Sequence, residues 1–375
     1  MNPSLLLISA SLFVWGIGEG MFYMFQPFYL SQLGANPEMI GYILGAFGFM
    51  MMIAHIPAGY LADRIGRRPM LISAWLIGIT AAWIMALANS LPVFIVGMLL
   101  YGFTAFVASP LNSYVTAARG KWSIGRAITL SNAAFGLGIV IGPFTGGWIA
   151  GHYGLRLIYF IAGSLFIFST LMIWMIAPQP REQHNPDNPA PSLFGNRRFL
   201  AFIALGFFVT LAMYLPQPFQ AKFLQDVRGL SLEQIGLLGT LGGIGNTVMT
   251  FAAGFMNVRL GFLLGQASAG VSTAIIWQMK SYGWFAASYF LLGGYRAART
   301  LYTAQIRPLV LESQMGLAYG ISETVQGLTL IIAPIVSGII YQSNPILIYP
   351  IALAGTLLAI LFSLFFTPRV DPQGT

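Results

Sequence analysis

Five side chains stand out in this sequence because they can carry a charge or move a proton within otherwise apolar stretches. They are Glu19, His55, Arg296, Arg299 and Glu323. A carboxyl group among apolar side chains holds its proton more tightly than one in water, so it can load and release that proton near neutral pH. The two arginines lie three positions apart, on one face of a helix, and together would suit an anion. These residue types indicate proton exchange and anion binding.

Structural roles are the alternatives for these residues. A charge at the centre of a membrane-spanning helix costs at least about 2.5 to 3.5 kcal/mol unless it is paired or hydrated. If Glu19 neutralised one arginine, the other would still need Glu323, water or an anionic ligand, so pairing explains only part of the pattern. Either acid could instead be a hydrogen-bonded packing residue, and His55 fits a satisfied polar residue as well. We predict that Glu19, then Glu323, then His55 carries the proton, and that Arg296 and Arg299 bind substrate.

Other polar and aromatic residues in the same stretches could line a partly apolar pocket around these charges. Most aromatic side chains in such stretches face lipid or neighbouring helices, so each candidate has that alternative. The candidates for substrate contact are Tyr23, Gln26, Asn112, Asn132, Gln217 and Tyr295.

The composition defines the kind of protein that must position these residues. Of 375 residues, 57% are hydrophobic and only 7% are charged, against about 25% charged in an ordinary soluble domain. The chain is therefore a polytopic membrane protein. Its net charge of +8 fits basic residues beside lipid headgroups, and without a soluble basic domain we expect no nucleic-acid partner. The absence of cysteine excludes disulfides and Cys-ligated metal sites, and we expect no metal or cofactor.

The apolar stretches divide the chain into helices and two halves. Cuts at glycine, proline, asparagine and charge clusters give about twelve helices, each long enough to cross about 30 Å of hydrocarbon. The one long polar stretch, residues 178–197, predicts a flexible cytoplasmic linker between a six-helix bundle at residues 1–177 and another at residues 198–375. The run from Ser4 to Leu33 is too long for a signal peptide and should be retained as a span.

The two halves resemble one another in sequence. A displacement of 191 positions brings Gln26-Pro27-Phe28 onto Gln217-Pro218-Phe219 and lays the fifth span onto the eleventh, with Pro143 on Pro334. This predicts a parallel repeat, with chance matching between similar compositions as the alternative. The glycines that coincide are Gly136 and Gly147 with Gly327 and Gly338, and, at a displacement of 195, Gly41, Gly59 and Gly66 with Gly236, Gly254 and Gly261.

A short charged turn, GYLADRIGRRPML over Gly59–Leu71, separates two long apolar runs. Its pattern G-x-x-x-D-R-x-G-R-R resembles the loop between the second and third helices of the major facilitator superfamily, a family of secondary transporters. The resemblance implies a conformational gate in which Asp63 meets the positive N-terminus of the eleventh helix, near Gly316–Gly320. For Arg67 and Arg68, anchoring beside anionic headgroups is the alternative. The gate residues in this loop are Gly59, Asp63, Arg64, Gly66, Arg67 and Arg68.

A second motif falls in the fifth span and resembles one common in the antiporters and drug exporters of this family. Small residues at every fourth position let helices approach closely, and a proline bends the span, so the segment could act as a pivot of the gate. Ordinary small-residue packing is the alternative. One departure concerns the fourth helix, where such exporters often carry an arginine and this chain has Met98. The residues of the motif are Gly138, Gly142, Pro143, Gly146 and Gly147.

Together these features predict one function. The resemblance implies an all-helical membrane protein of twelve helices in two pseudo-symmetric bundles, a secondary transporter that works by alternating access and is not an enzyme. We expect proton-coupled export of an amphiphilic or anionic small compound, with substrate, protons and the bilayer as partners and a monomer as the state. Proton-coupled uptake of an organic anion or sugar is the rival function. A non-transporting membrane sensor is a remote third.

The orientation follows from the lysines and arginines other than Arg296 and Arg299. Twelve are expected on the side of Gly59–Leu71 and the termini, and four on the opposite side. Because cytoplasmic loops carry the excess of basic residues, we expect a multi-pass protein of the cell membrane with both termini in the cytoplasm.

Overall fold

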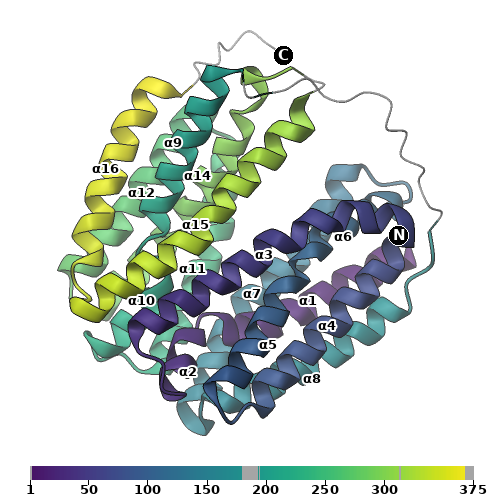
Figure 1. Cartoon of the computed structure of the whole chain (residues 1–375), viewed down its shortest axis with the longest axis horizontal. Helices are drawn as coiled ribbons and strands as arrows, with labels where there is room; N and C mark the ends of the chain where they lie inside the picture. Colours follow the sequence, from purple (N-terminus) through teal and green to yellow (C-terminus); the bar gives the residue numbers. More distant parts are fainter. Residues whose placement is uncertain (1, 180–192, 194, 312–313, 368–375) are drawn as a thin grey trace. The chain divides into compact units, whose positions relative to one another are not determined.

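The structure, a computed structural model of the whole chain, describes residues 2–179, 193, 195–311 and 314–367, with the backbone alone for residues 56–64 and 316. All regular secondary structure in this part of the chain is helical (Figure 1). Eleven of its helices, counted across short breaks, are long and apolar enough to cross a membrane. The remaining predicted span is broken at Leu292 into α13 (Tyr282–Leu291) and α14 (Gly293–Ala304). The all-helical fold is confirmed, and a twelve-helix arrangement fits it.

The described residues form two compact units. Unit 1 holds those within Met1–Asn36, Ala46–Asn185 and Leu224–Thr240, and unit 2 those within Pro37–Gly45, Pro186–Phe223 and Leu241–Thr375. Three helices, α3 (Pro37–Ile65), α10 (Gln217–Asp226) and α11 (Leu232–Ala253), have residues in both units. The other helices of unit 1 are α1 (Pro3–Tyr23), α2 (Gln26–Gln32), α4 (Arg67–Leu87), α5 (Leu91–Phe103), η1 (Thr104–Val107), α6 (Ala108–Ala117), α7 (Ile124–Tyr153) and α8 (Leu155–Trp174). Those of unit 2 are α9 (Arg197–Tyr214), α12 (Val258–Gln278), α13, α14, η2 (Arg307–Leu309), α15 (Met315–Ser343) and α16 (Ile348–Phe366).

Glycine sets the close packing of α1 against α7 in unit 1. A Cβ at Gly138 would lie 2.7 Å from Ile17 N, and one at Gly142 would lie 2.6 Å from Ile17 O. On the facing helix, a Cβ at Gly20 would lie 3.0 Å from Gly142 Cα. Any larger residue at these positions must push the two backbones apart. The pattern of small residues in the fifth span is therefore a contact surface between two helices.

The span over Leu91–Ala117 is not one continuous α-helix. A short 3₁₀ segment, η1, separates α5 from α6. Pro110 lies in the first turn of α6, where it cannot donate a backbone hydrogen bond to the turn before it and its ring crowds that turn. The break therefore has a local cause in the sequence, and it falls just after Tyr101.

Arginines tie the ends of antiparallel helices together. Arg68, at the start of α4, donates from Nη2 to the carbonyl of Trp174 at the end of α8 over 2.8 Å. Arg156, at the start of α8, donates from Nε to Ala86 O near the end of α4 over 2.9 Å. In unit 2, Arg259 at the start of α12 donates to Leu364 O near the end of α16. Each arginine satisfies a carbonyl that lacks a partner within its own helix and favours the negative helix end.

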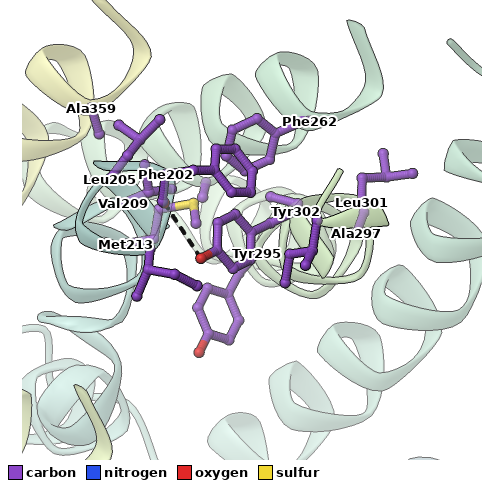
Figure 2. Close-up of a cluster of buried hydrophobic side chains, with 14 of the residues drawn as sticks. Phe202, Leu205, Val209, Met213, Phe262, Tyr295, Ala297, Leu301, Tyr302 and Ala359 are labelled. Carbon is purple, nitrogen blue, oxygen red and sulfur yellow. Dashed lines mark hydrogen bonds between the residues drawn. The ribbon is translucent and has the colours of Figure 1, made fainter. Parts of the chain in front are cut away.

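The core of unit 2 is aromatic and aliphatic, with α9, α12 and α14 around it. Figure 2 shows the Phe202, Phe262 and Tyr302 rings packed together. The rings of Phe202 and Tyr302 are stacked with centroids 4.7 Å apart. The Tyr302 ring occupies the space that a side chain at Gly206 would need. This core fixes α14, which carries both predicted substrate arginines.

Side chains hold both described ends of the predicted linker. Gln179 donates to Tyr114 O over 3.0 Å and accepts from Arg67 over 3.3 Å. At the other end, Leu193 is buried in the core of unit 2, and Asn196 caps α9 by accepting from Phe199 N over 3.1 Å. The predicted flexible part, residues 180–192, lies outside the described residues, and the predicted domain limits stay a prediction.

Candidate functional site

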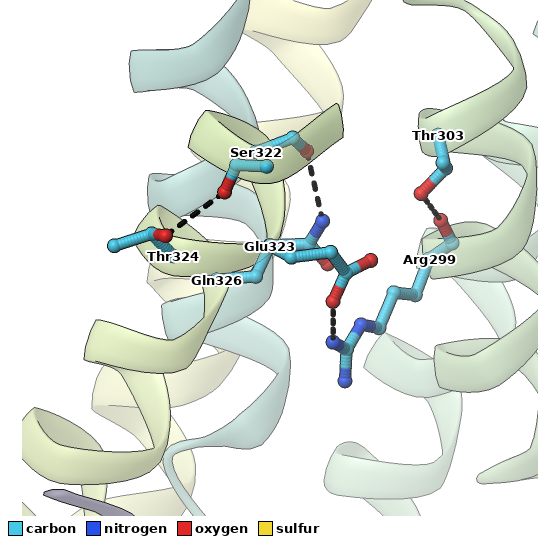
Figure 3. A network of polar contacts seen from close by, with 7 residues as sticks. Arg299, Thr303, Ser322, Glu323, Thr324 and Gln326 are labelled. Atoms are coloured by element: carbon cyan, nitrogen blue, oxygen red, sulfur yellow. Dashed lines mark hydrogen bonds and ion pairs between the residues drawn. The ribbon is translucent and has the colours of Figure 1, made fainter. Parts of the chain in front are cut away.

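An ion pair in unit 2 joins two of the residues that the sequence singled out. Arg299 lies on α14 and Glu323 on α15, and Arg299 Nη2 donates to Glu323 Oε2 over 2.8 Å (Figure 3). The two side chains are 34% and 56% exposed, so water and small molecules can reach both. One of the predicted substrate arginines is thus neutralised by one of the predicted proton carriers.

Aromatic side chains lie beside this ion pair. Tyr295, one turn before Arg299, is buried and lies against the guanidinium. Tyr214 of α9 stacks on Tyr295 with ring centroids 5.8 Å apart. The Arg299 guanidinium therefore lies between the side chain of Tyr295 and the exposed carboxylate of Glu323. Contact of Tyr295 with a substrate stays a prediction.

Arg296 has a different environment although it is only three residues away. Its side chain is exposed, and its carbonyl accepts from Thr300 Oγ1 over 3.0 Å. A separation of three residues corresponds to a rotation about 60° short of a full helical turn. The two arginines therefore point in different directions, so that Arg296 is exposed while Arg299 contacts Glu323 of α15. The pair predicted from the sequence is thus split into one half-buried and one exposed arginine.

A row of buried polar residues, which was not predicted from the sequence, lies on α15 next to Glu323. Ser322, Gln326 and Thr329 are all almost fully buried, and Gln326 Nε2 donates to Ser322 Oγ over 3.2 Å (Figure 3). Gln326 Oε1 and Thr329 Oγ1 have no hydrogen-bond partner among the described residues. Spacings of four and three keep such residues on one helix face, and that signal was present in the sequence.

A chain of hydrogen bonds in unit 1 ends at the other predicted proton carrier. Glu19 is half-buried on α1 and accepts from the Tyr101 hydroxyl of α5 over 2.8 Å. Tyr101 in turn accepts from Trp15 Nε1 over 3.1 Å. Tyr101 is buried. No role was predicted for Tyr101 from the sequence, because the sequence of an apolar span does not show which residue a tyrosine hydroxyl will contact.

The other predicted pocket residues are spread over both units, and the structure does not gather them into one site within either. Gln26 is buried and its Nε2 has no partner among the described residues, whereas Tyr23 is 41% exposed. Gln217, the first residue of α10, donates from Nε2 to Met213 O near the end of α9 over 3.1 Å. Asn132 is exposed on α7. Their contact with substrate stays a prediction.

One cavity of unit 1 is lined by two residues for which different roles were predicted. It has a volume of about 310 Å³ and lies between the start of α4 and the end of α6. Arg67, predicted for the gate, and Asn112, predicted for substrate, both line it. The lining residues are Arg67, Asn112, Ser113, Thr116, Ala117 and Arg119.

The remaining gate residues can be placed only in part. Gly66 has φ of 97° between α3 and α4, a conformation that favours glycine. The side chains of Asp63 and Arg64 lie outside the described part of the chain, and of Gly59 and Gly316 only the backbone helix is described. Arg68 holds the end of α8, as described above. The gating role of this loop stays a prediction.

The glycine motif of α7 makes two kinds of contact. Gly138, Gly142 and Gly146 face α1, as described for the first two. Gly147 faces α11, where a Cβ would lie 2.8 Å from Gly236 Cα. Pro143 lies within α7 between Gly142 and Gly146 and is near both helices, since added Cβ atoms at Gly20 of α1 and Gly236 of α11 would each contact it. The motif thus joins three helices in unit 1.

The last predicted proton carrier, His55, is exposed on α3. Within the described residues, no three histidine, aspartate or glutamate side chains lie close enough to hold a metal ion. Two of the three predicted proton carriers thus have an identified partner, Glu19 with the Tyr101 phenol and Glu323 with the Arg299 guanidinium.

The chain resembles known proteins in both sequence and fold. A model of the Major Facilitator Superfamily matches residues 8–262 and 207–375. Multidrug resistance protein 2 of Bacillus subtilis is 22% identical over 377 aligned positions, which cover 95% of this chain and 92% of that protein. Tetracycline resistance protein, class B, of Escherichia coli is 27% identical over 410 aligned positions, which cover 100% of this chain and 98% of that protein. A solved structure of a mutant of the nucleoside transporter NupG matches with a TM-score of 0.85 at 13% identity, over 97% of this chain and 99% of that one, and supports the fold alone.

Proposed function

This chain belongs to the major facilitator superfamily, and from that premise we propose that it exports an amphiphilic or anionic small compound across the cell membrane, driven by protons. It is a multi-pass membrane transporter of small molecules rather than an enzyme. Full-length similarity to multidrug and tetracycline resistance proteins supports export. We further propose that alternating access of a monomer is the mechanism, with both termini in the cytoplasm.

The observation that carries the proposal is the Arg299–Glu323 ion pair. Each partner neutralises the other at 2.8 Å, and both side chains are partly exposed. A proton on Glu323 removes the charge that Arg299 faces. A charged substrate can do the same by binding one partner in place of the other. Proton and substrate therefore act on one electrostatic contact, which is what coupling requires.

The sign of the substrate's charge decides whether the proton and the substrate move in opposite directions or together. A cationic amphiphile competes with the proton for Glu323, so proton entry would drive its release, as exchange requires. An anion binds Arg299 more readily once Glu323 is protonated, so proton and anion would load together, which is the coupling that the second candidate function requires. Each pH unit of gradient contributes about 1.4 kcal/mol per proton, and each net charge moved about 2.3 kcal/mol per 100 mV.

Proton-coupled uptake of an organic anion is the second candidate function. The exposed Arg296 beside the half-buried Arg299 favours it, because the described part of α14 carries two positive charges and no acid. Glu323 on α15 balances one of them. The remaining positive charge suits an anionic ligand.

Thermal stabilisation of the purified protein would identify the ligand class. Anions, cations, sugars and lipophiles are tested against the parent chain, Arg299→Gln and Arg296→Gln. A ligand at about 100 times its Kd stabilises by about 2.7 kcal/mol. We expect an effective ligand to lose its effect with Arg299→Gln and to keep most of it with Arg296→Gln, the matched control on the same helix. Equal stabilisation of all three proteins would show that Arg299 is outside the site.

Proteoliposomes then test coupling and direction with the ligand found. A pH dye trapped inside reports protons as substrate is added outside. Proton movement opposite to the substrate supports exchange, and movement with the substrate supports cotransport. We expect Glu323→Gln or Glu19→Gln to abolish the proton movement. Substrate transport with no proton movement in the parent chain would contradict proton coupling.

A further inference from the structure

Tyr101 connects the acid of α1 to the broken span over Leu91–Ala117. The indole N–H of Trp15 can only donate a hydrogen bond, so the Tyr101 oxygen must accept from it over 3.1 Å. The single Tyr101 proton is then directed to Glu19 Oε2, 2.8 Å away. The direction of the chain is fixed: Trp15 donates to Tyr101, and Tyr101 donates to Glu19.

The far end of this chain is rigid. The Trp15 indole stacks on Phe166 with ring centroids 3.9 Å apart and an angle of 11° between the ring planes. It also packs on Trp75, with centroids 5.2 Å apart, and fills the space that a side chain at Gly78 would need. Trp15 cannot follow a movement of Tyr101. Any change in the length of the chain must therefore occur at Glu19 or at the α5 backbone.

That backbone is held at the break in the span. Thr104, the first residue of η1, donates from Oγ1 to the Tyr101 carbonyl over 2.6 Å. The Tyr101 side chain thus bonds to α1 while its carbonyl bonds to the first residue after α5. A 3₁₀ stretch in the middle of a helical span often marks a hinge.

We propose that Tyr101 is a positioning residue that couples the protonation of Glu19 to the bend of the span over Leu91–Ala117. This inference rests on the proposed function, in which Glu19 is a candidate proton carrier beside Glu323. The ionised Glu19 receives a charge-assisted hydrogen bond, which is about twice as strong as a neutral one. When Glu19 binds a proton, the pull on Tyr101 weakens, and the end of α5 is released to change its angle to α6.

Few other titratable groups lie near this site among the described residues. On α1 itself, Tyr23 lies one turn beyond Glu19. α7 carries Arg126 near its start and His152 and Tyr153 at its end, and α8 carries Arg156 and Tyr159 near its start. α3 contacts α5 where Phe47 meets Gly102, and its His55 lies two turns further along. Glu19 is the acid that Tyr101 contacts.

The experiment uses the absence of cysteine from the chain. Ala117→Cys at the end of α6 and Met175→Cys just after α8 are exposed positions for two spin labels. Met175 follows Trp174, which Arg68 ties to α4, so it is a fixed reference. The distance between the labels is measured in the full-length protein in nanodiscs at pH 5.5 and pH 8.5. This readout needs no substrate and does not itself titrate.

Four substitutions in this labelled protein separate the possible causes. Glu19→Gln imitates the protonated acid and should give the low-pH distance at both pH values. Tyr101→Phe removes only the hydroxyl and should abolish the shift with pH. The matched control is Tyr159→Phe, which removes a buried hydroxyl that has no partner among the described residues, and it should keep the shift. Thr104→Val, which keeps the phenol, should change the distance at both pH values.

The outcomes distinguish this inference from the proposed function. If Glu19→Gln abolishes the shift and Tyr101→Phe keeps it, Glu19 carries the proton but Tyr101 does not couple it, and the inference is overturned alone. If Glu19→Gln shifts like the parent, Glu19 is not the group whose protonation moves the labels, and the inference is overturned while the Arg299–Glu323 site of the proposed function stands. No shift in the parent chain, or loss of the shift in Tyr159→Phe, also overturns the inference. Loss in Glu19→Gln and Tyr101→Phe, with the shift kept in Tyr159→Phe, supports it.

Discussion

At the scale of single residues, the two arginines of α14 show what a charge does in two environments. The sequence placed both in one span, and both are there. It could not tell that Arg299 meets Glu323 while Arg296 is exposed, because the ion pair depends on where α15 lies beside α14, and spacing along one helix does not show its neighbour. Their separate roles can be measured by their effect on stability.

Removing Arg299 should change ligand binding far more than stability. Because the side chains of its ion pair are one third and more than half exposed, solvent screening leaves the pair about 0 to 1 kcal/mol. Arg299→Gln should therefore lower the unfolding free energy by less than about 1 kcal/mol, and Arg296→Gln by less still. Thermal unfolding without ligand measures both. A loss of about 3 to 5 kcal/mol from Arg299→Gln would instead indicate a buried structural pair.

Glu19 and Tyr101 show the limit of sequence reasoning at this scale. The acid was found because a carboxyl group in an apolar span is rare. Its partner was not, because the hydrogen bond joins residues 82 positions apart and depends on how α5 is rotated toward α1. Spacing along the chain carries no such information.

At the scale of elements, the glycine motif of α7 was recognised in the sequence, but its partner was not. Its fourfold spacing predicts a surface for a close helix, and the structure provides α1, whose own Gly16 and Gly20 take part. The proposed pivot and the alternative of ordinary packing both need this contact. The contact can be tested by itself.

We expect Gly142→Ala to destabilise the protein and Gly136→Ala to leave it almost unchanged. The added methyl group at Gly142 would lie 2.5 Å from Gly20 Cα, whereas that at Gly136 meets nothing within 4 Å. Overpacking of this kind costs about 1 to 3 kcal/mol. Thermal unfolding of the two variants in one detergent measures the difference. Equal effects would mean that α1 and α7 are not in backbone contact there.

The ties between helix ends predict a second effect. Arg68 and Arg259 are related by the repeat displacement of 191 positions, and each bonds the last turn of its partner helix. Arg68→Gln and Arg259→Gln should each lower the unfolding free energy by about 1 kcal/mol, the scale of a cation at a helix C-terminus. Arg197→Gln, at an exposed arginine that begins α9, is the control. No loss from either would leave gating or lipid anchoring as the role of Arg68.

At the scale of the whole molecule, the repeat found in the sequence returns as a pair of equivalent contacts. Gly147 and Gly338, which coincide in the repeat, meet Gly236 and Gly41, which coincide as well. In unit 1, α7 meets the beginning of α11, and in unit 2, α15 meets the beginning of α3. Sequence cuts at the linker could not show this, because α3 and α11 are continuous helices whose ends belong to different units.

The orientation of the chain in its membrane follows from the same whole-molecule pattern and can be tested on one span. Of the sixteen basic residues other than Arg296 and Arg299, the topology predicted from the sequence puts twelve on one side and four on the other, and the richer side is expected to be cytoplasmic. Asn89 precedes α5 and Ala117 is the last residue of α6, so these two exposed positions lie at opposite ends of one crossing and can each be replaced by cysteine. In the cysteine-free chain, a membrane-impermeant maleimide added to intact cells should label Asn89→Cys at once and Ala117→Cys only after permeabilisation. The reverse result would put the turn at Gly59–Leu71 outside the cell, where no cytoplasmic gate could form, and both labels reacting from outside would show that this segment does not cross the membrane.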